Sequence, residues 1–192
     1  MKYLELQKTL KSIKKPFYTT SDLEKIIGLK KASLTVTLNR LVKKNLLLKL
    51  SKGVFILPEN LDKIPEVANQ IYTPSYLSFE SALSRYGILS QFPYTFTFAT
   101  NKRSKKLFLG ETEIEYRQLK PDLFSNFIRE GDLLIAQPEK ALLDQLYLIS
   151  RGKTSISLDE LDLSSLNKKK FIKMSKIFPK ETQRLTKGLL KY

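Results

Sequence analysis

The sequence contains neither cysteine nor histidine. Without cysteine, the chain can form no disulfide bond, no zinc site with thiolate ligands and no cysteine nucleophile. Without histidine, it lacks the commonest metal ligand and the side chain that most often acts as a base near neutral pH. These two absences exclude several large classes of enzymes and of structural metal-binding domains.

Long apolar runs and glycine-rich loops are also missing. No segment approaches the roughly 18 apolar residues that a membrane span requires, and no apolar secretory signal follows the first residues. We therefore expect a cytoplasmic protein with no membrane partner. The chain has only 7 glycines, and none of them forms a phosphate-binding loop motif.

The acidic residues do not form a recognisable catalytic motif. Metal-dependent nucleases commonly use an acidic residue with lysine two positions later, and no Asp or Glu here has that spacing. Glu111, Glu113 and Glu115 alternate along an expected strand and would share one side of it. A DNA-processing enzyme with Mg²⁺ at this strand is one alternative, and a solvated strand face is the other. We predict no catalytic residue, no metal site and no cofactor.

What the sequence does contain is an uneven excess of positive charge, with a net charge of +15. Residues 1–58 carry 13 Lys and Arg against 3 acids, residues 59–151 carry 11 against 12, and residues 152–192 carry 10 against 4. A general bias in composition would spread the excess evenly. Because clustered positive charge is typical of phosphate contacts, we expect a nucleic acid as partner.

The first thirty residues predict two helices. The first helix lies between Lys2 and Lys14 and is stopped by Pro16. Thr20 or Ser21 would begin the second helix, with Glu24 closing a capping box on Ser21, and Gly28 would end it. The apolar stripe of the first helix is Leu4, Leu6, Leu10 and Ile13.

A third helix and a hairpin follow. Leu34, Leu38 and Leu41 recur at spacings of four and three, which predicts a helix from about Lys31 to Lys44 with one buried face. Short apolar runs on both sides of Ser51-Lys52-Gly53 predict a β-hairpin. Helix, helix, turn, helix and basic hairpin is the order of a winged helix-turn-helix, whose third helix enters the DNA major groove. A winged helix used to bind protein is the alternative for this region.

This reading assigns DNA contacts to named residues. The early turns of the third helix and the turn that follows would face the bases, lysines on either side would bind phosphates, and hydroxyls at a helix N-terminus would add donors. The expected base-facing residues are Lys31, Ser33, Thr35, Asn39 and Arg40. The expected phosphate-binding residues are Lys30, Lys43, Lys44, Lys49 and Lys52, with Thr19, Thr20 and Ser21 as donors.

The rest of the chain predicts an α+β protein with a winged helix-turn-helix at 1–58, a linker at 59–75 and a mixed α/β domain at 76–192. In that domain Ser78 would cap a helix that Gly87 ends, and Pro138 would begin a helix reaching Ser150, in which Lys140 and Asp144 form an ion pair. The expected strands are 94–100, 106–109, 112–119 and 132–136.

A basic helical end follows from about residue 152. One helix would begin at Asn167, with an apolar side made of Phe171, Met174, Ile177 and Phe178, and the last would cover 181–190. The lysines of this end would either face solvent or touch DNA beside the winged helix. These candidate DNA contacts are Lys168, Lys169, Lys170, Lys173 and Lys176.

The order of several short motifs resembles the AbiEi antitoxin family. These motifs are Tyr76-Leu77-Ser78-Phe79-Glu80-Ser81-Ala82-Leu83 with Tyr86-Gly87, Phe98-Ala99-Thr100, Ile135-Ala136, and Pro138-Glu139-Lys140-Ala141-Leu142-Leu143-Asp144. With the N-terminal pattern, the resemblance covers nearly the whole chain. Asn45, where glycine is more usual, and the basic tail depart from the family pattern.

The resemblance implies an antitoxin of a type IV toxin–antitoxin operon. Such a protein would bind inverted repeats in its own promoter, often cooperatively, and repress the operon. It would oppose a nucleotidyltransferase-like toxin through the C-terminal domain without a stable complex. A winged-helix regulator that senses a small ligand is the alternative, with Tyr94, Phe96 and Phe98 lining a pocket.

Overall fold

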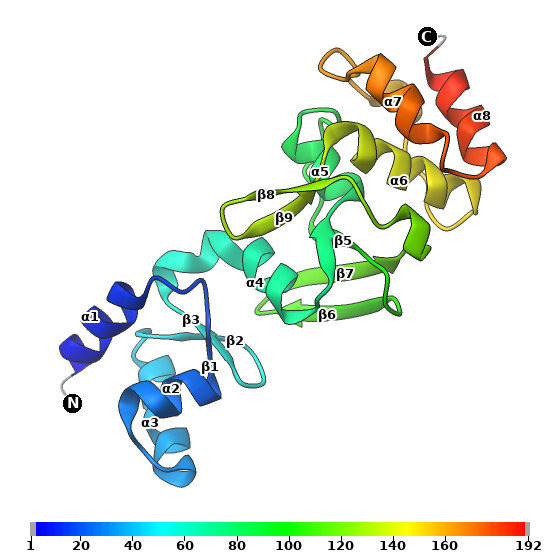
Figure 1. The fold of residues 1–192 in the computed structure, drawn as a ribbon. Coiled ribbons are helices and arrows are strands. Elements are labelled where there is room, and N and C mark those ends of the chain that lie inside the picture. Colours follow the sequence, from blue (N-terminus) through cyan, green and yellow to red (C-terminus); the bar gives the residue numbers. More distant parts are fainter. Residues whose placement is uncertain (1–2, 191–192) are drawn as a thin grey trace. The chain divides into compact units, whose positions relative to one another are not determined.

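The computed structural model describes residues 3–190, with side chains from Glu5 onward, and the chain divides into two compact units. Unit 1 comprises the chain up to Val67 together with Phe108–Glu111, and unit 2 comprises Ala68–Leu107 and the chain from Thr112. Both units contain helices and strands (Figure 1). The expectation of an α+β protein is therefore confirmed.

Unit 1 consists of three helices and a small antiparallel sheet in the order β1-β3-β2. The sequence analysis did not predict β1, which pairs Tyr18 with Phe55 and Thr19 with Val54. The elements are α1 (Tyr3–Ile13), β1 (Tyr18–Thr19), α2 (Thr20–Ile27), α3 (Lys31–Lys43), β2 (Leu48–Ser51) and β3 (Val54–Ile56). A 3₁₀ turn, Pro58–Lys63, follows the sheet.

The core of unit 1 joins all three helices to the sheet. Its buried members are Leu6, Leu10, Tyr18, Leu23, Leu34, Leu38, Leu41, Leu47, Phe55 and Leu57. The predicted burial of the α3 leucines is thus confirmed. Ile13 was expected on the same stripe as Leu10 but is 40% exposed, because it lies in the last turn of α1, where the chain turns away at Lys14 with φ of 55°. The side chain of Leu4 lies outside the described residues.

Unit 2 is built on a six-stranded sheet in the order β6-β7-β5-β4-β9-β8. The central strand β4 pairs antiparallel with β5 and parallel with β9, and β5 pairs parallel with β7. The strands are β4 (Ser75–Leu77), β5 (Thr95–Thr100), β6 (Lys105–Leu109), β7 (Thr112–Gln118), β8 (Phe127–Glu130) and β9 (Leu133–Ala136). Four of them were predicted, whereas β4 and β8 were not.

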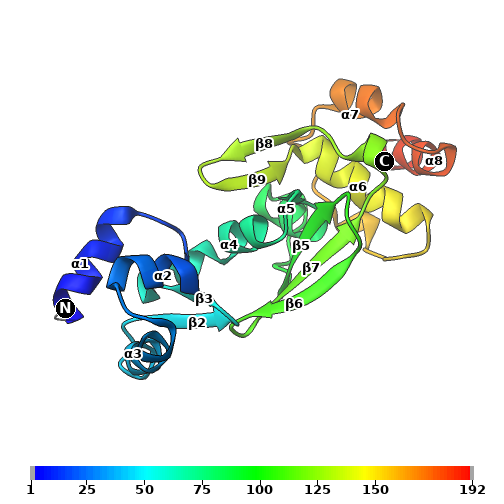
Figure 2. The ribbon, with the colours of Figure 1, turned by 60° about the horizontal axis from the view of Figure 1, so that its bottom comes forward.

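Helix α6 is the centre of the helical layer of unit 2. It packs against α5, α7 and α8, and every residue from Glu139 to Leu148 is buried. In Figure 1 and Figure 2, α7 and α8 lie on the side of α6 that faces away from β5. The helices are α5 (Phe79–Arg85), α6 (Pro138–Ser150), α7 (Lys168–Ser175) and α8 (Lys180–Leu189), and α4 (Ile64–Ile71) contains the boundary between the two units at Val67.

A buried ion pair links α6 to β4. Lys140 donates to Asp144 one helical turn away, as predicted, but both side chains are completely buried. Tyr76 and Ser78 also donate to Asp144, at 3.0 Å and 2.8 Å. Ser78 is therefore the N-cap residue of α5 by position only, because its hydroxyl bonds to Asp144 and not to the helix. Burial raises the pKa of Asp144 and lowers that of Lys140, and each charge depends on the other for compensation.

Removing only one member of this pair should be costly. We expect Lys140→Met to lower the free energy of unfolding by about 3–5 kcal/mol, because an uncompensated carboxylate stays buried. Lys140→Met/Asp144→Asn should recover part of the loss, since no charge is then left in the core. Urea unfolding followed by circular dichroism measures both variants.

The exposed pair Arg85–Glu130, at 3.1 Å, provides the control. Its double alanine variant should cost less than about 1 kcal/mol. An equally small cost for Lys140→Met would show that the buried pair does not stabilise unit 2.

Candidate nucleic-acid interface

The start of α2 is fixed by a capping box two residues earlier than the predicted box of Ser21 and Glu24. Thr19 is the N-cap residue, its hydroxyl accepts from the Asp22 amide at 3.1 Å, and Asp22 accepts from the Thr19 amide at 2.9 Å. The expected cap by Thr20 or Ser21 with Glu24 is wrong, because pairing of Thr19 with Val54 keeps Thr19 in an extended conformation just before the helix. Lys15 binds Asp22 at 2.8 Å and anchors the box.

The turn between α2 and α3 has the predicted position. Gly28 ends α2 with φ of 73°, a conformation that favours glycine, and Lys30 precedes the first turn of α3. After α3, Asn45 has φ of 54°, so it takes the left-handed conformation for which asparagine is tolerated. The left-handed conformations of Gly28 and Asn45 thus mark the turns before and after α3.

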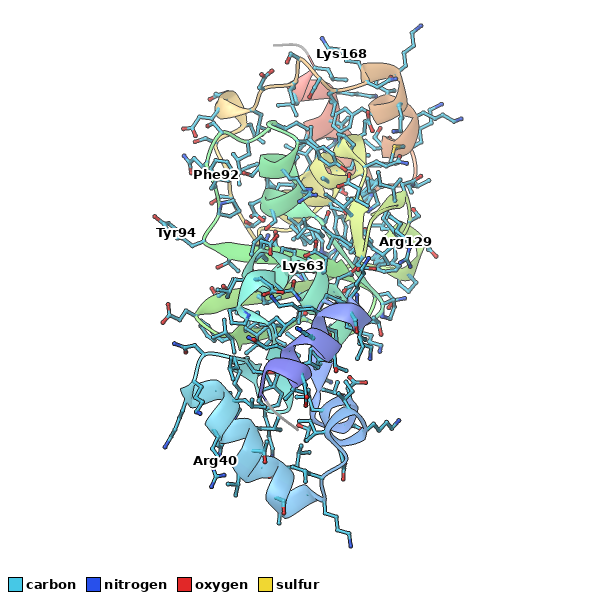
Figure 3. All side chains as sticks on the ribbon, turned by 90° about the vertical axis from the view of Figure 1, so that its left-hand side faces the viewer. Arg40, Lys63, Phe92, Tyr94, Arg129 and Lys168 are labelled. Atoms are coloured by element: carbon cyan, nitrogen blue, oxygen red, sulfur yellow. The ribbon has the colours of Figure 1, made fainter. Side chains whose placement is uncertain are left out.

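One face of α3 is exposed to solvent. Because a helix turns by about 100° per residue, the side opposite Leu34, Leu38 and Leu41 carries residues near 32, 36, 39 and 43. Arg40 points away from the core of unit 1 (Figure 3). The exposed residues of α3 are Lys31, Ala32, Ser33, Thr35, Val36, Asn39, Arg40 and Lys43. No acidic residue lies between Lys30 and Lys44.

Two of the expected hydrogen-bond donors are used within unit 1. The Thr35 hydroxyl donates to the Lys31 carbonyl at 3.0 Å, and the Thr19 hydroxyl donates to Asp22 at 2.8 Å. The Thr20 amide donates to Gly53 at 3.0 Å, which ties the start of α2 to the hairpin tip. Among the hydroxyl residues expected to contact DNA, Ser21 and Ser33 are exposed and Thr20 is half-buried.

The β2–β3 hairpin presents two of the predicted phosphate-binding lysines. Lys49 and Lys52 are exposed, and Gly53 makes the turn with φ of 78°. Lys30 and Lys44, which flank α3, are exposed as well. Unit 1 therefore combines a polar helix face and a basic hairpin.

The lysines of α7 do not all have the same surroundings. Lys168, Lys169, Lys173 and Lys176 are exposed, and Lys168 is labelled in Figure 3. Lys170 instead forms an ion pair at 2.8 Å with Glu139 of α6. Phe171 and Phe178 are buried as predicted. Ile177 is 52% exposed, contrary to expectation, because it follows the end of α7 and lies outside the apolar side that packs on α6.

Glu113 and Glu115 of the acidic strand β7 bind cations and a hydroxyl of unit 2. Glu113 accepts from Thr95 at 2.7 Å and lies 3.5 Å from Lys106, and Glu115 pairs with Arg117 at 2.8 Å. The hydrogen bond from Thr95 is the main reason why the pKa of Glu113 is lowered. Within residues 3–190, no three or more Asp or Glu side chains are grouped so that they could hold a metal ion.

The aromatic residues proposed for ligand sensing do not line a common pocket. Tyr94 precedes β5 and is fully exposed, whereas Phe98 is completely buried in the core. A cavity of about 370 Å³ is lined by Tyr94 together with Phe92 and Glu160, among others. Phe98 is not part of that lining.

Comparison with known proteins assigns the chain to no family. No protein-family model matches the chain, and a search of curated proteins finds no match either. None of the helices in the described part of the chain combines the length and the apolar composition needed to cross a bilayer.

The Thr19–Asp22 capping box should make the stability of unit 1 depend on pH. The hydrogen bond from Lys15, followed by those from Thr19, lowers the pKa of Asp22 from 3.8 to about 2. The stabilisation is complete above the ordinary pKa and is lost as the pH falls through about 2. Asp22→Asn should therefore lower the melting temperature of unit 1 at neutral pH, with the difference shrinking in strong acid.

Thermal unfolding followed by circular dichroism measures the effect, and Glu24→Gln is the control because Glu24 is the other acid of α2 and is exposed. We expect Glu24→Gln to leave the melting temperature nearly unchanged at every pH. A larger loss of melting temperature in Glu24→Gln than in Asp22→Asn would show that Ser21 and Glu24 form the cap instead.

Proposed function

We propose that unit 1 is a winged helix-turn-helix that binds double-stranded DNA, and that the chain is the repressor and antitoxin of a type IV toxin–antitoxin operon. The observation that carries the DNA-binding part is the exposed face of α3. Its leucines are buried, its outer face has no acid, and Ser33, Asn39 and Arg40 are exposed on it.

The dimensions of this face suit a major groove. A helix with its side chains is about 10–12 Å across, and the major groove of B-DNA is about 12 Å wide. Asn39 can bond adenine through two hydrogen bonds, and Arg40 can bond guanine in the same way. Lys31 lies in the first turn of α3 and would face the bases, while Lys30 and Lys43, toward the two ends of α3, would bind phosphates and fix the helix in the groove.

The hairpin of unit 1 would act as the wing. Lys49 and Lys52 lie on a two-strand hairpin whose tip is bonded to the start of α2 through Thr20 and Gly53. A hairpin held in this way can bind the backbone beside the helix without reading the bases. Its two lysines would then add affinity and little specificity.

The antitoxin part of the proposal depends on the family resemblance, and one feature of unit 2 supports it. Tyr76 and Ser78 come from one of the motifs that carry the resemblance, and Lys140 and Asp144 from another. These four residues meet in a single buried network. Their spacing in the sequence is thus explained by one shared structural role. The toxin would be opposed through residues 76–192 without a stable complex, and DNA binding at inverted repeats would be cooperative.

Loss of three cations from α3 and its preceding turn should abolish specific binding. Lys30→Ala/Lys31→Ala/Arg40→Ala removes groove and phosphate contacts together, so the shift of the DNA upstream of the gene in a gel assay should disappear. The control Lys102→Ala/Arg103→Ala/Lys120→Ala removes the same charge from exposed positions of unit 2. If both triple variants bound equally, α3 would not be the reading helix.

The exposed lysines of α7 provide a separate test of a second DNA contact. Lys168→Gln/Lys169→Gln/Lys173→Gln should reduce the log–log salt slope of binding by about 0.9 for each phosphate that the protein no longer neutralises. Lys170→Gln should change stability but not the slope, because Lys170 is paired with Glu139. An unchanged slope in the triple variant would show that the α7 face lies away from DNA.

A further inference from the structure

The centre of the exposed face of α3 is apolar. Val36 is 51% exposed, and Ala32, one turn earlier, is exposed as well. By helical spacing, Val36 lies almost opposite Leu34 and Leu41, on the side of α3 that faces away from the core of unit 1. Polar residues surround this position: Ser33, Asn39, Arg40 and Lys43.

Within the described residues, packing does not explain a valine at this position. Its side chain adds little to the core at this exposure, and its branched side chain is less favourable in a helix than alanine or lysine. In the described α-helices of unit 1, only Val36 and Ile13 are large apolar side chains that are exposed. A contact outside the chain would account for its placement.

The chemistry of the major groove provides such a contact. Thymine carries a methyl group at C5, which is the one apolar group that a standard base pair presents in that groove. Hydrogen-bonding side chains cannot recognise it, whereas a methyl-bearing side chain buries it on contact. The neighbouring Thr35 adds to the apolar character of this face of α3, because its hydroxyl already donates to the Lys31 carbonyl of the same helix.

We propose that Val36 is a specificity-determining residue that recognises the methyl group of a thymine in the operator. This inference rests on the proposed function, since it requires α3 to lie in the major groove. Val36 would contact thymine at the centre of the recognised sequence, while Asn39 and Arg40 bond neighbouring bases one turn further along α3. The resulting site contains at least one A·T pair in the part covered by α3.

Replacement of thymine by deoxyuridine isolates this contact, because the two bases differ only by the methyl group. The DNA upstream of the gene is first footprinted with the wild-type protein, and the protected segment is then synthesised with thymine and with deoxyuridine. The affinities of wild type, Val36→Ala and Ile13→Ala are measured on both duplexes. Ile13 is the matched control, as an exposed apolar residue of α1.

We expect the wild-type protein to bind the deoxyuridine duplex about fourfold more weakly, the size that one buried methyl group gives. Val36→Ala should bind the thymine duplex more weakly by a similar factor and discriminate much less between the two duplexes. Ile13→Ala should behave as wild type. Because alanine favours helix, the melting temperature of Val36→Ala should not fall, so weaker binding would not reflect unfolding.

The outcomes separate this inference from the function on which it rests. Protection of the upstream DNA with an equal deoxyuridine penalty for wild type and Val36→Ala would overturn the role of Val36 and leave the repressor assignment intact. Absence of any protected segment would overturn the proposed function, and this inference with it. A deoxyuridine penalty for wild type that Val36→Ala removes supports both.

Discussion

Burial of Leu34, Leu38 and Leu41 is the constraint on which the rest of unit 1 depends. These three leucines fix the rotation of α3 about its own axis, so they also determine which residues face outward. A helix rotated by half a turn would bury Asn39 and Lys43 and expose leucines, at a cost of several kcal/mol, because each fully buried leucine contributes about 1.5–3 kcal/mol. The apolar contacts on one side of α3 thereby position the polar and methyl-bearing groups on the other.

The two units use charge in opposite ways. In unit 1 the cations of α3 and the hairpin are exposed, where they stay hydrated and available to a polyanion. In unit 2 the charges of Lys140 and Asp144 are buried and compensate each other, and the buried Glu139 of α6 is paired with the partly exposed Lys170 of α7. A charge without its partner would destabilise unit 2, whereas the unpartnered face of α3 would give unit 1 its proposed activity.

The sequence predicted those elements whose signals are local. Leucine spacing gave α3 and its exposed face, Gly28 and Pro138 marked helix ends, and alternation gave β5. The structure differs from these predictions where contacts between residues far apart in the sequence determine the local conformation or burial. Thr19 rather than Ser21 caps α2 because β1 pairs with a strand some 35 residues later. Lys140 and Asp144 were predicted to pair, but their burial results from Tyr76 and from helices α7 and α8. Val36 was not among the predicted DNA contacts, and its proposed role rests on its exposure in the structure beside the internally bonded Thr35.

Placement of α3 in a major groove is the central claim, and the absence of cysteine allows it to be tested directly. In the variant Ser33→Cys, the single cysteine is labelled with an iron chelate that cleaves nearby DNA by producing hydroxyl radicals. If α3 lies in a major groove, we expect strong cleavage on both strands, confined to one short segment in each protected half-site and offset as expected for a source in the major groove. Diffuse cleavage, equal to that from a cysteine placed at Lys8 of α1, would contradict it.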